Sequence, residues 1–376
     1  MTDTLVIGGG VIGLMTAYHL AREGRRIVLV EKSDTGREAS WAGGGIVSPL
    51  YPWRYSSPVQ ALARWSAGFY GEFCAQLELE TGIDPEHQVT GLYWLDMEDE
   101  DQALTWARRE GCELQSLLAD RVRARIEGLG RQYHHALYMP GVANVRNPRL
   151  LQSLRAALQA NPLVELREQA EAQELLVRSG RIAGVRVAGE ILNCDVVVLA
   201  AGAWSSGLMP PLEAGGLPVE PVKGQMILYR CAPDFLPSMI LAGRRYAIPR
   251  RDGHVLVGST LEHLGFDKSP SQEALQSLRK TAEELLPALA DAPVAGHWAG
   301  LRPGSPEGIP FIGEVPGVEG LWLNCGHYRN GLVMAPASCR LLVDLMLGRA
   351  PIVDPAPYSP AGRLGELASI RRGRGA

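Results

Sequence analysis

The fold of this chain is decided by the stretch Leu5-Val6-Ile7-Gly8-Gly9-Gly10-Val11-Ile12-Gly13-Leu14. Its three leading apolar residues predict a short strand, and the glycine run that follows predicts a tight turn. Residues 14–22 predict a helix, and residues 27–30 (I-V-L-V) predict a second strand that ends at Glu31. A strand, a glycine turn, a helix and a second strand that ends in an acid are typical of a Rossmann-type dinucleotide site.

The glycines of this turn have the spacing G-x-G-x-x-G, with Gly8, Gly10 and Gly13 at the three positions. The first makes the turn, the second lets the backbone approach a pyrophosphate, and the third lets the helix pack closely on the strand. The N-terminus of the helix favours the negative charge, and Glu31 would bind the adenosine ribose. The same turn also brings Val11, Ile12 and Lys32 to the predicted nucleotide. An ordinary glycine turn of another α/β protein is the alternative interpretation.

Three later segments favour FAD over NAD. Ser40–Gly45 (S-W-A-G-G-G) can wrap a pyrophosphate with backbone amides. The apolar run 195–200 predicts a buried parallel strand that leads into Ala201–Trp204 (A-G-A-W), which we expect to close over the cofactor. Residues 326–331 (G-H-Y-R-N-G) open a helix whose amides would stabilise charge on a reduced flavin. Segments spread from the start to the end of the chain suit the extended FAD molecule. The residues expected to contact it here are Ser40, Ala42, Gly43, Gly44, Gly202, Trp204, His327, Tyr328, Arg329, Asn330, Gly331 and Leu332.

Composition excludes several classes of protein. The chain has 376 residues, a net charge of −4 and 46% hydrophobic residues, which is ordinary for a globular enzyme of one large or two interleaved domains. No long basic run precedes the extreme C-terminus, so we expect no nucleic-acid partner. None of the six cysteines forms a C-x-x-C pair, so we expect no metal site and reduced thiols in a cytoplasmic protein. No uninterrupted apolar stretch is long enough to predict a membrane span.

The rest of the chain predicts a second, antiparallel sheet. Residues 219–229, 246–249 and 254–258 have the apolar composition of strands. Asn147-Pro148 and Ser269-Pro270 each place a capping residue before a proline, which predicts helix starts at both places. The residues after Pro351 are rich in proline, glycine and arginine, and we expect them to be loosely ordered.

Five motifs resemble those of the D-amino-acid oxidase superfamily, and most closely the glycine oxidases of thiamine biosynthesis. They are V-I-G-G-G-V-I-G near the start, A-A-G-A-W-S at 200–205, P-V-K-G-Q at 221–225, W-A-G-L-R-P-G at 298–304 and G-H-Y-R-N-G-L at 326–332. The early fingerprint is shared with many flavoproteins, and the two late motifs are the specific signal. The resemblance covers nearly the whole chain to about residue 360.

The resemblance implies an α/β fold in which a Rossmann-like FAD-binding domain is interleaved with an antiparallel-sheet substrate domain. It implies noncovalent FAD, a small amino-acid substrate, an imine product, and O2 as the acceptor that yields hydrogen peroxide. It also implies a homo-oligomer and a partner in the thiazole-synthase pathway. The domain bounds that follow are 1–45, 141–210 and 305–350 for FAD binding, 46–140 and 211–304 for substrate, and 351–376 for a C-terminal tail.

Three side chains are assigned to the substrate by the resemblance. The arginine of L-R-P-G, Arg302, would bind the substrate carboxylate, helped by Tyr246 in Y-A-I-P-R, and Arg329 would lie near flavin and substrate. A guanidinium binds a carboxylate bidentately, and pinning that end would hold the α-hydrogen over the flavin. No catalytic base is then needed, and His327 is expected to contact FAD through its backbone. A buried ion pair for Arg302, an ordinary strand tyrosine for Tyr246 and a helix-ordering role for Arg329 are the alternatives.

Two segments differ from related patterns. Relatives with covalent flavin carry a histidine in a S/T-W-H-A-A-G segment or a cysteine soon after the L-R-P region. Here Ala42 stands at the first position, and residues 303–308 contain no cysteine. The segment Ser48–Tyr55 is rich in aromatic residues, and it is either a lid that affects substrate choice or a surface loop packed on the sheet.

Other functions stay open at this stage. One is an amino-acid dehydrogenase subunit that passes electrons to a partner or quinone. Another is the flavin domain of an RNA-modifying enzyme, which the absence of a basic run disfavours. A third is a flavoprotein that serves mainly as the binding partner of a thiazole-forming enzyme. The motifs do not decide between glycine, sarcosine and small D-amino acids as the preferred substrate.

Overall fold

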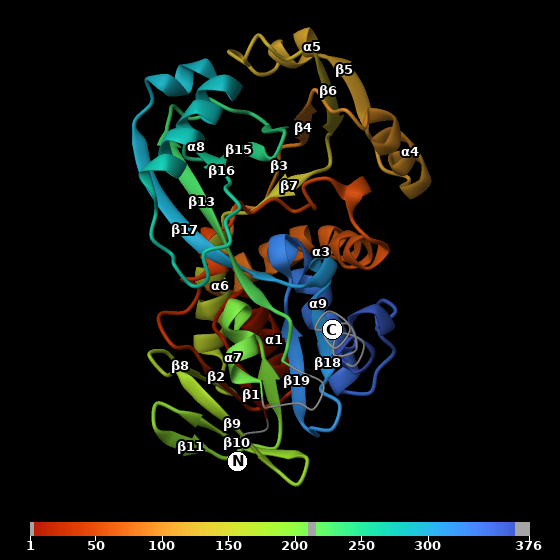
Figure 1. Cartoon of the computed structure of the whole chain (residues 1–376), viewed down its shortest axis with the longest axis vertical. Helices are drawn as coiled ribbons and strands as arrows, with labels where there is room; N and C mark the ends of the chain where they lie inside the picture. Colours follow the sequence, from red (N-terminus) through yellow and green to blue (C-terminus); the bar gives the residue numbers. More distant parts are fainter. Residues whose placement is uncertain (1–3, 210–215, 365–376) are drawn as a thin grey trace, which may run out of the picture.

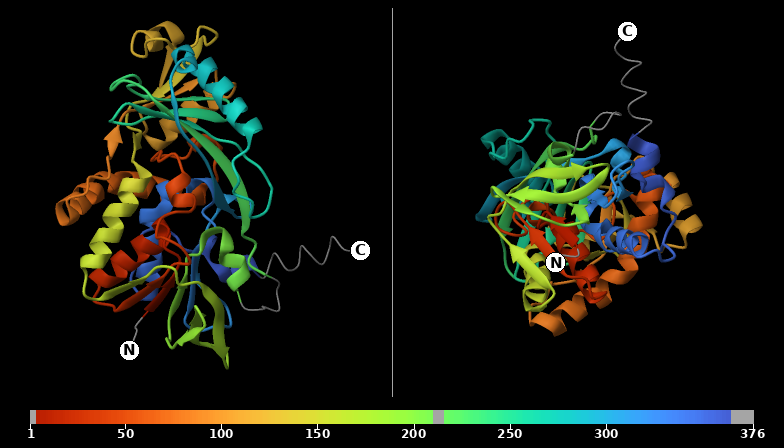
Figure 2. Two further views of the ribbon diagram at one scale, coloured as in Figure 1. Left: turned by 90° about the vertical axis from the view of Figure 1, so that its left-hand side faces the viewer. Right: turned by 90° about the horizontal axis from the view of Figure 1, so that it is seen from below.

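The structure, a computed structural model, describes residues 4–209 and 216–364. Within these ranges a six-stranded sheet forms the lower layer of Figure 1 and an eight-stranded sheet the upper layer. The long strands β13 (Glu220–Arg230) and β17 (Val294–Gly304) reach from the upper layer toward the lower one, as both views in Figures 1 and 2 show. The fold class predicted from the sequence, a Rossmann-like layer interleaved with an antiparallel sheet, is confirmed.

The lower sheet has the strand order β18-β19-β12-β1-β2-β8 in the described part of the chain. Within the run 195–200 predicted as a strand, Val197–Leu199 form the strand, which pairs in parallel with its neighbours on both sides and is fully buried, as its apolar sequence requires. The edge strand β18 runs antiparallel to β19. The strands of this sheet are β1 (Thr4–Ile7), β2 (Ile27–Val30), β8 (Val164–Arg167), β12 (Val197–Leu199), β18 (Phe311–Glu314) and β19 (Leu321–Cys325).

Helices cover one face of the lower sheet and a small sheet covers the other. The helical face is a single core to which α1 (Val11–Arg22), α3 (Ser57–Thr81), α6 (Asn147–Ala160) and α9 (Gly331–Met346) all contribute buried apolar side chains. The opposite face packs against a three-stranded sheet through a second core. The strands of the small sheet are β9 (Ala172–Arg178), β10 (Arg181–Val187) and β11 (Glu190–Leu192).

The upper sheet has the order β17-β13-β16-β15-β14-β4-β6-β5 in the described ranges. Its neighbours are antiparallel except for β14 and β4. Helix α8 (Gln272–Leu285) packs on one face through Leu278, Ala282 and Leu285. The other strands of this sheet are β4 (Leu92–Leu95), β5 (Gln115–Leu118), β6 (His135–Met139), β14 (Met239–Ala242), β15 (Arg245–Pro249) and β16 (His254–Gly258). A separate pair joins β3 (Gln88–Val89) and β7 (Ala143–Asn144).

The helices connect these layers. The α-helices are α1 (Val11–Arg22), α2 (Ala39–Ala42), α3 (Ser57–Thr81), α4 (Glu100–Glu110), α5 (Ala119–Arg123), α6 (Asn147–Ala160), α7 (Ser205–Leu208), α8 (Gln272–Leu285) and α9 (Gly331–Met346). Short 3-10 turns are η1 (Pro52–Arg54), η2 (Gly202–Trp204), η3 (Pro287–Ala290), η4 (Pro306–Gly308), η5 (Tyr328–Asn330) and η6 (Ala356–Tyr358). No helix in the described ranges is both long and apolar enough to cross a membrane.

Tertiary contacts alter several local expectations. Helix α3 falls in the segment 46–140, yet its apolar face packs with α1, α6 and α9 on the lower sheet. Helix α8 begins at Gln272, two residues beyond the predicted start, and Ser271 caps it. The reason is that the carbonyl of Ser269 accepts a hydrogen bond from Lys223 Nζ at 2.6 Å, which holds that residue outside the helix. The domain bounds therefore stay a proposal, and the boundary at 210–211 lies outside the described residues.

The described part of the predicted tail is ordered, contrary to expectation. Tyr358 is buried, and its hydroxyl donates to the Pro58 carbonyl at 2.8 Å. Arg363 donates to the Ile309 carbonyl at 2.9 Å. Proline-rich sequence predicted looseness here because it lacks helix and strand patterns, but one buried aromatic ring and two long-range bonds are enough to order the segment. Residues 365–376 of the predicted tail lie outside the described residues.

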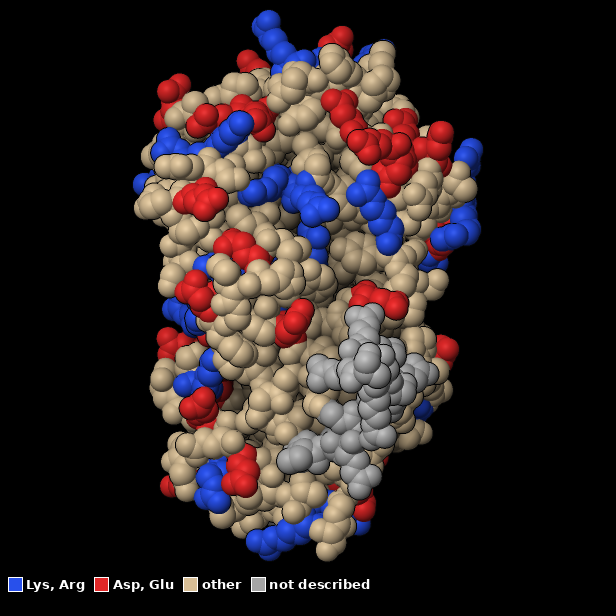
Figure 3. All heavy atoms as spheres, in the orientation of Figure 1, with Lys and Arg blue, Asp and Glu red and all other residues tan. Residues whose placement is uncertain are grey.

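Acidic and basic side chains are interspersed over the face seen in Figure 3, with an acidic group over α4 at the upper right. Mixed signs of this kind create no strong single-sign field on this face.

Candidate active site

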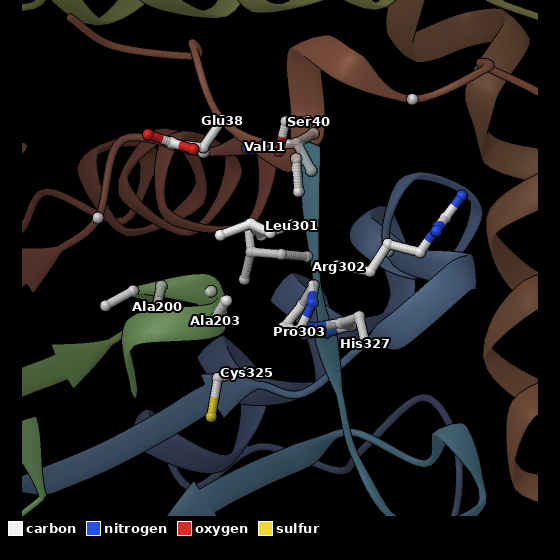
Figure 4. A pocket seen from close by; sticks show the side chains of 18 of the residues that line it. Val11, Glu38, Ser40, Ala200, Ala203, Leu301, Arg302, Pro303, Cys325 and His327 are labelled. Carbon is white, nitrogen blue, oxygen red and sulfur yellow. Dashed lines mark hydrogen bonds between the residues drawn. The ribbon is translucent and has the colours of Figure 1, made fainter. Parts of the chain in front are cut away.

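A cavity of about 570 Å³ takes its walls from both sheets. This volume lies within the range of small-molecule and cofactor sites. Figure 4 shows Ala200 and Ala203 on one side, Arg302, Pro303 and His327 on the other, and Val11 and Ser40 from the N-terminal segments above. The sequence-predicted residues that line the cavity are Gly8, Gly10, Val11, Ile12, Glu31, Lys32, Ser40, Gly43, Gly44, Gly202, Trp204, Tyr246, Arg302, His327, Tyr328, Arg329, Asn330, Gly331 and Leu332.

The glycine turn joins the first strand to α1 at one end of this cavity. A Cβ atom on Gly13 would lie 1.8 Å from the Gly8 carbonyl oxygen, so only glycine allows the helix to pack this closely on the turn. Gly13 itself does not line the cavity, which agrees with a packing role. At the start of α1, the Val11 amide donates to Ser40 Oγ at 2.9 Å, which ties the second glycine-rich segment to the first.

Glu31 holds the turn from the end of β2. Its Oε2 accepts from the Gly9 amide at 2.7 Å, and its Oε1 accepts from the Ser33 amide at 3.0 Å and the Ser33 hydroxyl at 3.1 Å. A carboxylate has about four acceptor positions, so about one is left for a ligand hydroxyl. Nearby, the Lys32 ammonium lies 3.2 Å from the centre of the Trp204 ring. Burial lowers the pKa of Lys32. The acid thus shapes the nucleotide end and still has capacity to bind there.

Arg302 occupies the other end of the cavity, on β17. Its guanidinium donates to the carbonyls of Lys223 (3.3 Å) and Thr260 (3.2 Å) and to Ser259 Oγ (2.7 Å). Among the residues that the structure describes, no carboxylate lies within ion-pair distance of it. Burial lowers the pKa of Arg302, because a charged group is costly in a poorly solvated place. A partly buried cation without an anion favours the arrival of an anionic ligand.

The backbone beneath Arg302 is glycine for a steric reason. A Cβ atom on Gly224 would lie 2.2 Å from Arg302 Nη1, so any side chain there would displace the guanidinium. Val222 pairs with Arg302 in the β13–β17 ladder, which places Gly224 two residues along the neighbouring strand. The P-V-K-G-Q motif therefore supports the L-R-P-G motif across the sheet.

Tyr246 lies on the same sheet, on β15. Its ring is buried, and its hydroxyl donates to Met226 Sδ at 3.4 Å. Gly258 stands between these two residues in the sheet, paired with Met226 on β13 and with Tyr246 on β15. Burial lowers the pKa of Arg302, and the nearby Tyr246 hydroxyl acts in the opposite direction and raises it. The phenol and the guanidinium thus act on one region of the cavity.

The start of α9 closes the cavity between these ends. Its first backbone amides have no intrahelical acceptor, and Gly331 and Leu332 line the cavity. Behind them, His327 Nε2 contacts Ser338 Oγ at 2.6 Å, and Ser338 donates to Asn324 Oδ1 at 2.6 Å. Burial lowers the pKa of His327 to about 3, so its ring is neutral at physiological pH. This buried chain of hydrogen bonds anchors the start of the helix.

Two buried polar atoms of the cavity lining need a partner. Asn330 Nδ2 and Asn147 Oδ1 have no hydrogen-bond partner in the described structure, although Asn147 Nδ2 donates to the Ser40 carbonyl at 2.6 Å. An unsatisfied buried donor or acceptor is costly unless a ligand satisfies it. With two helix N-termini, a glycine turn and a strand-end acid, the residues present fit a long dinucleotide such as FAD.

Comparison with protein families decides the class. The family described as "FAD dependent oxidoreductase" matches residues 3–345. The chain belongs to this family. FAD is therefore the cofactor of this oxidoreductase, as the three glycine-rich segments predict.

The sequence of this oxidoreductase aligns over almost its whole length with curated relatives. It is 60% identical over 363 residues to the glycine oxidase of Pseudomonas putida, covering 96% of this chain and 99% of that one. It is 62% identical over 360 residues to the glycine oxidase of Pseudomonas aeruginosa, with the same coverage. It is 32% identical over 356 residues to the bifunctional protein ThiO/ThiG of Synechocystis, of which it covers 52%. Among solved structures, the glycine oxidase of Geobacillus kaustophilus matches with a TM-score of 0.88 at 30% identity, over 95% of this chain and 97% of that one.

Two expectations from the sequence concern Ala42, predicted to contact FAD, and the aromatic segment Ser48–Tyr55. Ala42 does not line the cavity; its carbonyl instead accepts from Trp298 Nε1 at 3.2 Å, and its methyl packs against Gly300. The aromatic segment Ser48–Tyr55 is packed on the upper sheet, with Tyr51 and Trp53 buried. Ser48 and Leu50 of that segment nevertheless line the cavity. The packed loop, rather than an exposed lid, is the alternative that the structure supports.

Sequence reasoning missed the residues that hold Arg302. No local sequence pattern marks these residues, which are Lys223, Ser259 and Thr260. Lys223 and Thr260 contribute only their backbone carbonyl oxygens, which every residue type has. The one available signal was the glycine of P-V-K-G-Q, because a glycine inside a strand often marks a close approach of another group.

Proposed function

We propose that this oxidoreductase oxidises glycine and other small amino acids, such as sarcosine and small D-amino acids. A hydride leaves the α-carbon and a proton leaves the amine, giving an imine that water hydrolyses to a 2-oxo acid and ammonia, or methylamine in the case of sarcosine. FAD, when bound, accepts the hydride, and O2 reoxidises it with release of hydrogen peroxide. The observation that carries this proposal is Arg302, a partly buried cation that lines the cavity without a carboxylate partner in the described chain. The high identity to glycine oxidases supports the same substrate class.

The chain's own groups would act by positioning. Arg302 binds the substrate carboxylate through a planar fork, and Tyr246 lies beside it on the sheet. Fixing the carboxylate of so small a substrate also fixes the position of its α-carbon. Most of the rate acceleration would come from this positioning. The acids that line the cavity in the described structure are Glu31, Glu38 and Glu171, all toward the nucleotide end. No carboxylate is therefore placed to act as a base, and we infer that the amine reacts in its neutral form.

A panel of amines tests this proposal. We expect peroxide release under air with glycine, sarcosine and D-alanine, and very little with amines that lack a carboxylate. If turnover requires a dye or quinone and yields no peroxide, the chain is a dehydrogenase, which is the alternative left open by the sequence. If no amine is turned over, a role as a binding partner replaces the proposal.

The proposal also covers the cellular location, the oligomeric state and the metabolic pathway of the enzyme. We place the enzyme in the cytoplasm, and we expect a homo-oligomer. We also infer a link to the thiazole branch of thiamine biosynthesis, supported by the similarity to the bifunctional ThiO/ThiG protein. Detection of a complex or of coupled turnover with a thiazole-forming enzyme would test that link.

A further inference from the structure

A serine hydroxyl lies beside Arg302 at the substrate end of the cavity. Ser259 directly follows β16, only 7% of its surface is exposed, and it lines the cavity. Its Oγ accepts a hydrogen bond from Arg302 Nη2 at 2.7 Å. A hydroxyl group can donate one hydrogen bond and accept two, yet no residue of the described chain accepts a bond from Ser259. The Ser259 proton is therefore available to a ligand that enters the cavity.

The surroundings of this proton favour an anionic acceptor. A buried donor is costly unless it finds an acceptor. The hydrogen bond from the Arg302 cation also polarises the hydroxyl, which makes it a stronger donor than an isolated serine. In the described part of the chain, the acids that line the cavity are Glu31, Glu38 and Glu171, all toward the nucleotide end. The acceptor that fits is the anion that Arg302 attracts.

The guanidinium of Arg302 is already shared with the protein. Its Nη1 donates to the carbonyls of Lys223 at 3.3 Å and Thr260 at 3.2 Å, and its Nη2 donates to Ser259. Both terminal nitrogens of the fork therefore have acceptors before any substrate binds. A carboxylate offers about four acceptor positions. A further donor next to the guanidinium thus adds to what the fork can supply.

The segment that carries Ser259 is held in place by β13. The Gln225 amide donates to Thr260 Oγ1 at 2.9 Å, and the Thr260 amide donates to the Gln225 carbonyl at 3.3 Å. Two residues further along, the backbones of Lys223 and Glu262 exchange hydrogen bonds of 2.9 and 3.0 Å. A donor that is held in place before binding loses little conformational freedom when the ligand arrives.

We propose that the Ser259 hydroxyl donates a hydrogen bond to the carboxylate that Arg302 binds, so that it is a second group that selects substrates with a carboxylate. The inference rests on the proposed function, because that carboxylate must first be placed at Arg302. The serine forms no covalent bond, and its proton stays on Oγ. A contact to an end of the substrate that does not react is equally strong before and in the transition state. It should therefore affect KM far more than kcat.

The alternative is that Ser259 serves only as an acceptor that orients Arg302. The two functions differ in what loss of the hydroxyl changes. Loss of an acceptor would let the guanidinium move and would lower kcat, because the α-carbon loses its position over the flavin. Loss of a donor leaves Arg302 bonded to its two carbonyls and weakens the binding of carboxylates alone.

Ser259→Ala gives the first test. Glycolate is titrated into the FAD-loaded enzyme, and its Kd is followed by the flavin absorbance. We expect this Kd and the KM for glycine to rise about ten- to hundredfold, as suits a hydrogen bond to a charged group. The kcat for glycine and the turnover of ethylamine, which lacks a carboxylate, should change far less. Ser259→Thr keeps the hydroxyl and should recover part of the loss, whereas an unchanged KM and Kd in Ser259→Ala would overturn the inference.

Ser271→Ala is the matched control, because it removes a serine hydroxyl from the same connection between β16 and α8. Ser271 Oγ accepts from the Gln225 side chain and the Ala274 amide, both at 3.2 Å, and Ser271 does not line the cavity. Its replacement should lower thermal stability, because α8 loses its cap, and should affect glycine and ethylamine to the same extent. If this control raises the KM for glycine as much as Ser259→Ala does, the effect is indirect and the contact is refuted.

A crystal structure of the FAD-loaded wild-type enzyme with glycolate gives the direct test. The expected distance from Ser259 Oγ to a carboxylate oxygen is about 2.5–2.7 Å, and a separation beyond about 3.5 Å would exclude the bond. In the same complex of Ser259→Ala, Arg302 should keep its bonds to the two carbonyls. A guanidinium that leaves them would make Ser259 a positioning residue and contradict the inference.

Failure of this inference is distinguishable from failure of the proposed function. If the wild-type enzyme neither releases peroxide with glycine nor binds glycolate, the proposed function itself fails. If it does both and Ser259→Ala behaves like the wild type, the function stands and the serine contact is refuted. Should Ser259→Ala lose FAD, Ser259→Thr and the wild-type complex with glycolate still decide the question.

Discussion

Removal of the Arg302 guanidinium is the perturbation for which the structure predicts the largest selective loss. In Arg302→Leu, a substrate carboxylate would enter a buried region without a cation. The hydroxyl of Ser259 and the carbonyls of Lys223 and Thr260 would also lose their donor. Loss of one member of a buried charge pair costs about 2–5 kcal/mol. At about 1.4 kcal/mol per tenfold, kcat/KM for glycine should fall roughly 30- to 4,000-fold.

The assay compares glycine with ethylamine, which lacks the carboxylate, and includes a titration with glycolate as a non-amine carboxylate. The loss should be large for glycine and glycolate and small for ethylamine, while FAD content is retained. Arg302→Lys should recover only part of the loss. Gly224→Ala tests the same geometry without removing the charge, because its Cβ would collide with the guanidinium, and it should also impair glycine selectively.

Arg250→Leu is the matched control for burial. Arg250 is a buried arginine that bonds to the Asn144 side chain and to the carbonyls of Val145 and Gly44, and it does not itself line the cavity. Its replacement should lower thermal stability and affect glycine and ethylamine to the same extent. If Arg302→Leu behaves like this control, or oxidises glycine normally, Arg302 is a structural arginine and the case for an amino-acid substrate loses its main residue.

Four other predictions follow from the site. Glu31→Ala should weaken FAD binding about 10- to 150-fold, since a charged acceptor contributes about 1.5–3 kcal/mol; an unchanged dissociation constant would remove Glu31 from the ribose site. Acid or heat precipitation should release about one FAD per chain, and flavin that stays on the denatured polypeptide would contradict noncovalent binding. Tyr51→Phe or Trp53→Phe should alter the ratio of glycine, sarcosine and D-alanine turnover more than FAD content, because their loop supplies the cavity wall; equal effects on all three would argue against this. Burial lowers the pKa of His19 to about 4, so folding holds it neutral while the unfolded chain protonates near pH 6.5. Its contribution to stability is thus complete above that pH and is lost as the pH falls toward 4. His19→Phe should reduce by roughly 2 kcal/mol the loss of unfolding free energy between pH 7 and 4.5, measured in urea.

The sequence alone determined the nucleotide end of this protein. The strand, turn, helix and acid between Leu5 and Glu31 lie close along the chain, so their spacing carries their geometry directly. The parallel strand Val197–Leu199, inside the predicted run 195–200, was equally readable, because a strand buried on both faces must be apolar throughout. The late motifs around Arg302 and Arg329 were found by resemblance, and the cavity contains both residues.

Only the tertiary structure decided which groups surround those arginines. Arg302 meets Lys223, 79 residues away, and Ser259, 43 residues away, because β17, β13 and β16 are neighbours in one sheet. Asn147 was predicted as a helix cap, yet its side chain binds the Ser40 carbonyl, 107 residues away. In the segment Ser48–Tyr55, the rings of Tyr51 and Trp53 pack on the upper sheet, which the local sequence does not decide. Local patterns report periodicity and turn chemistry, whereas these partners are selected by the pairing of distant strands, and backbone carbonyls that serve as partners leave no trace in the identity of their residues.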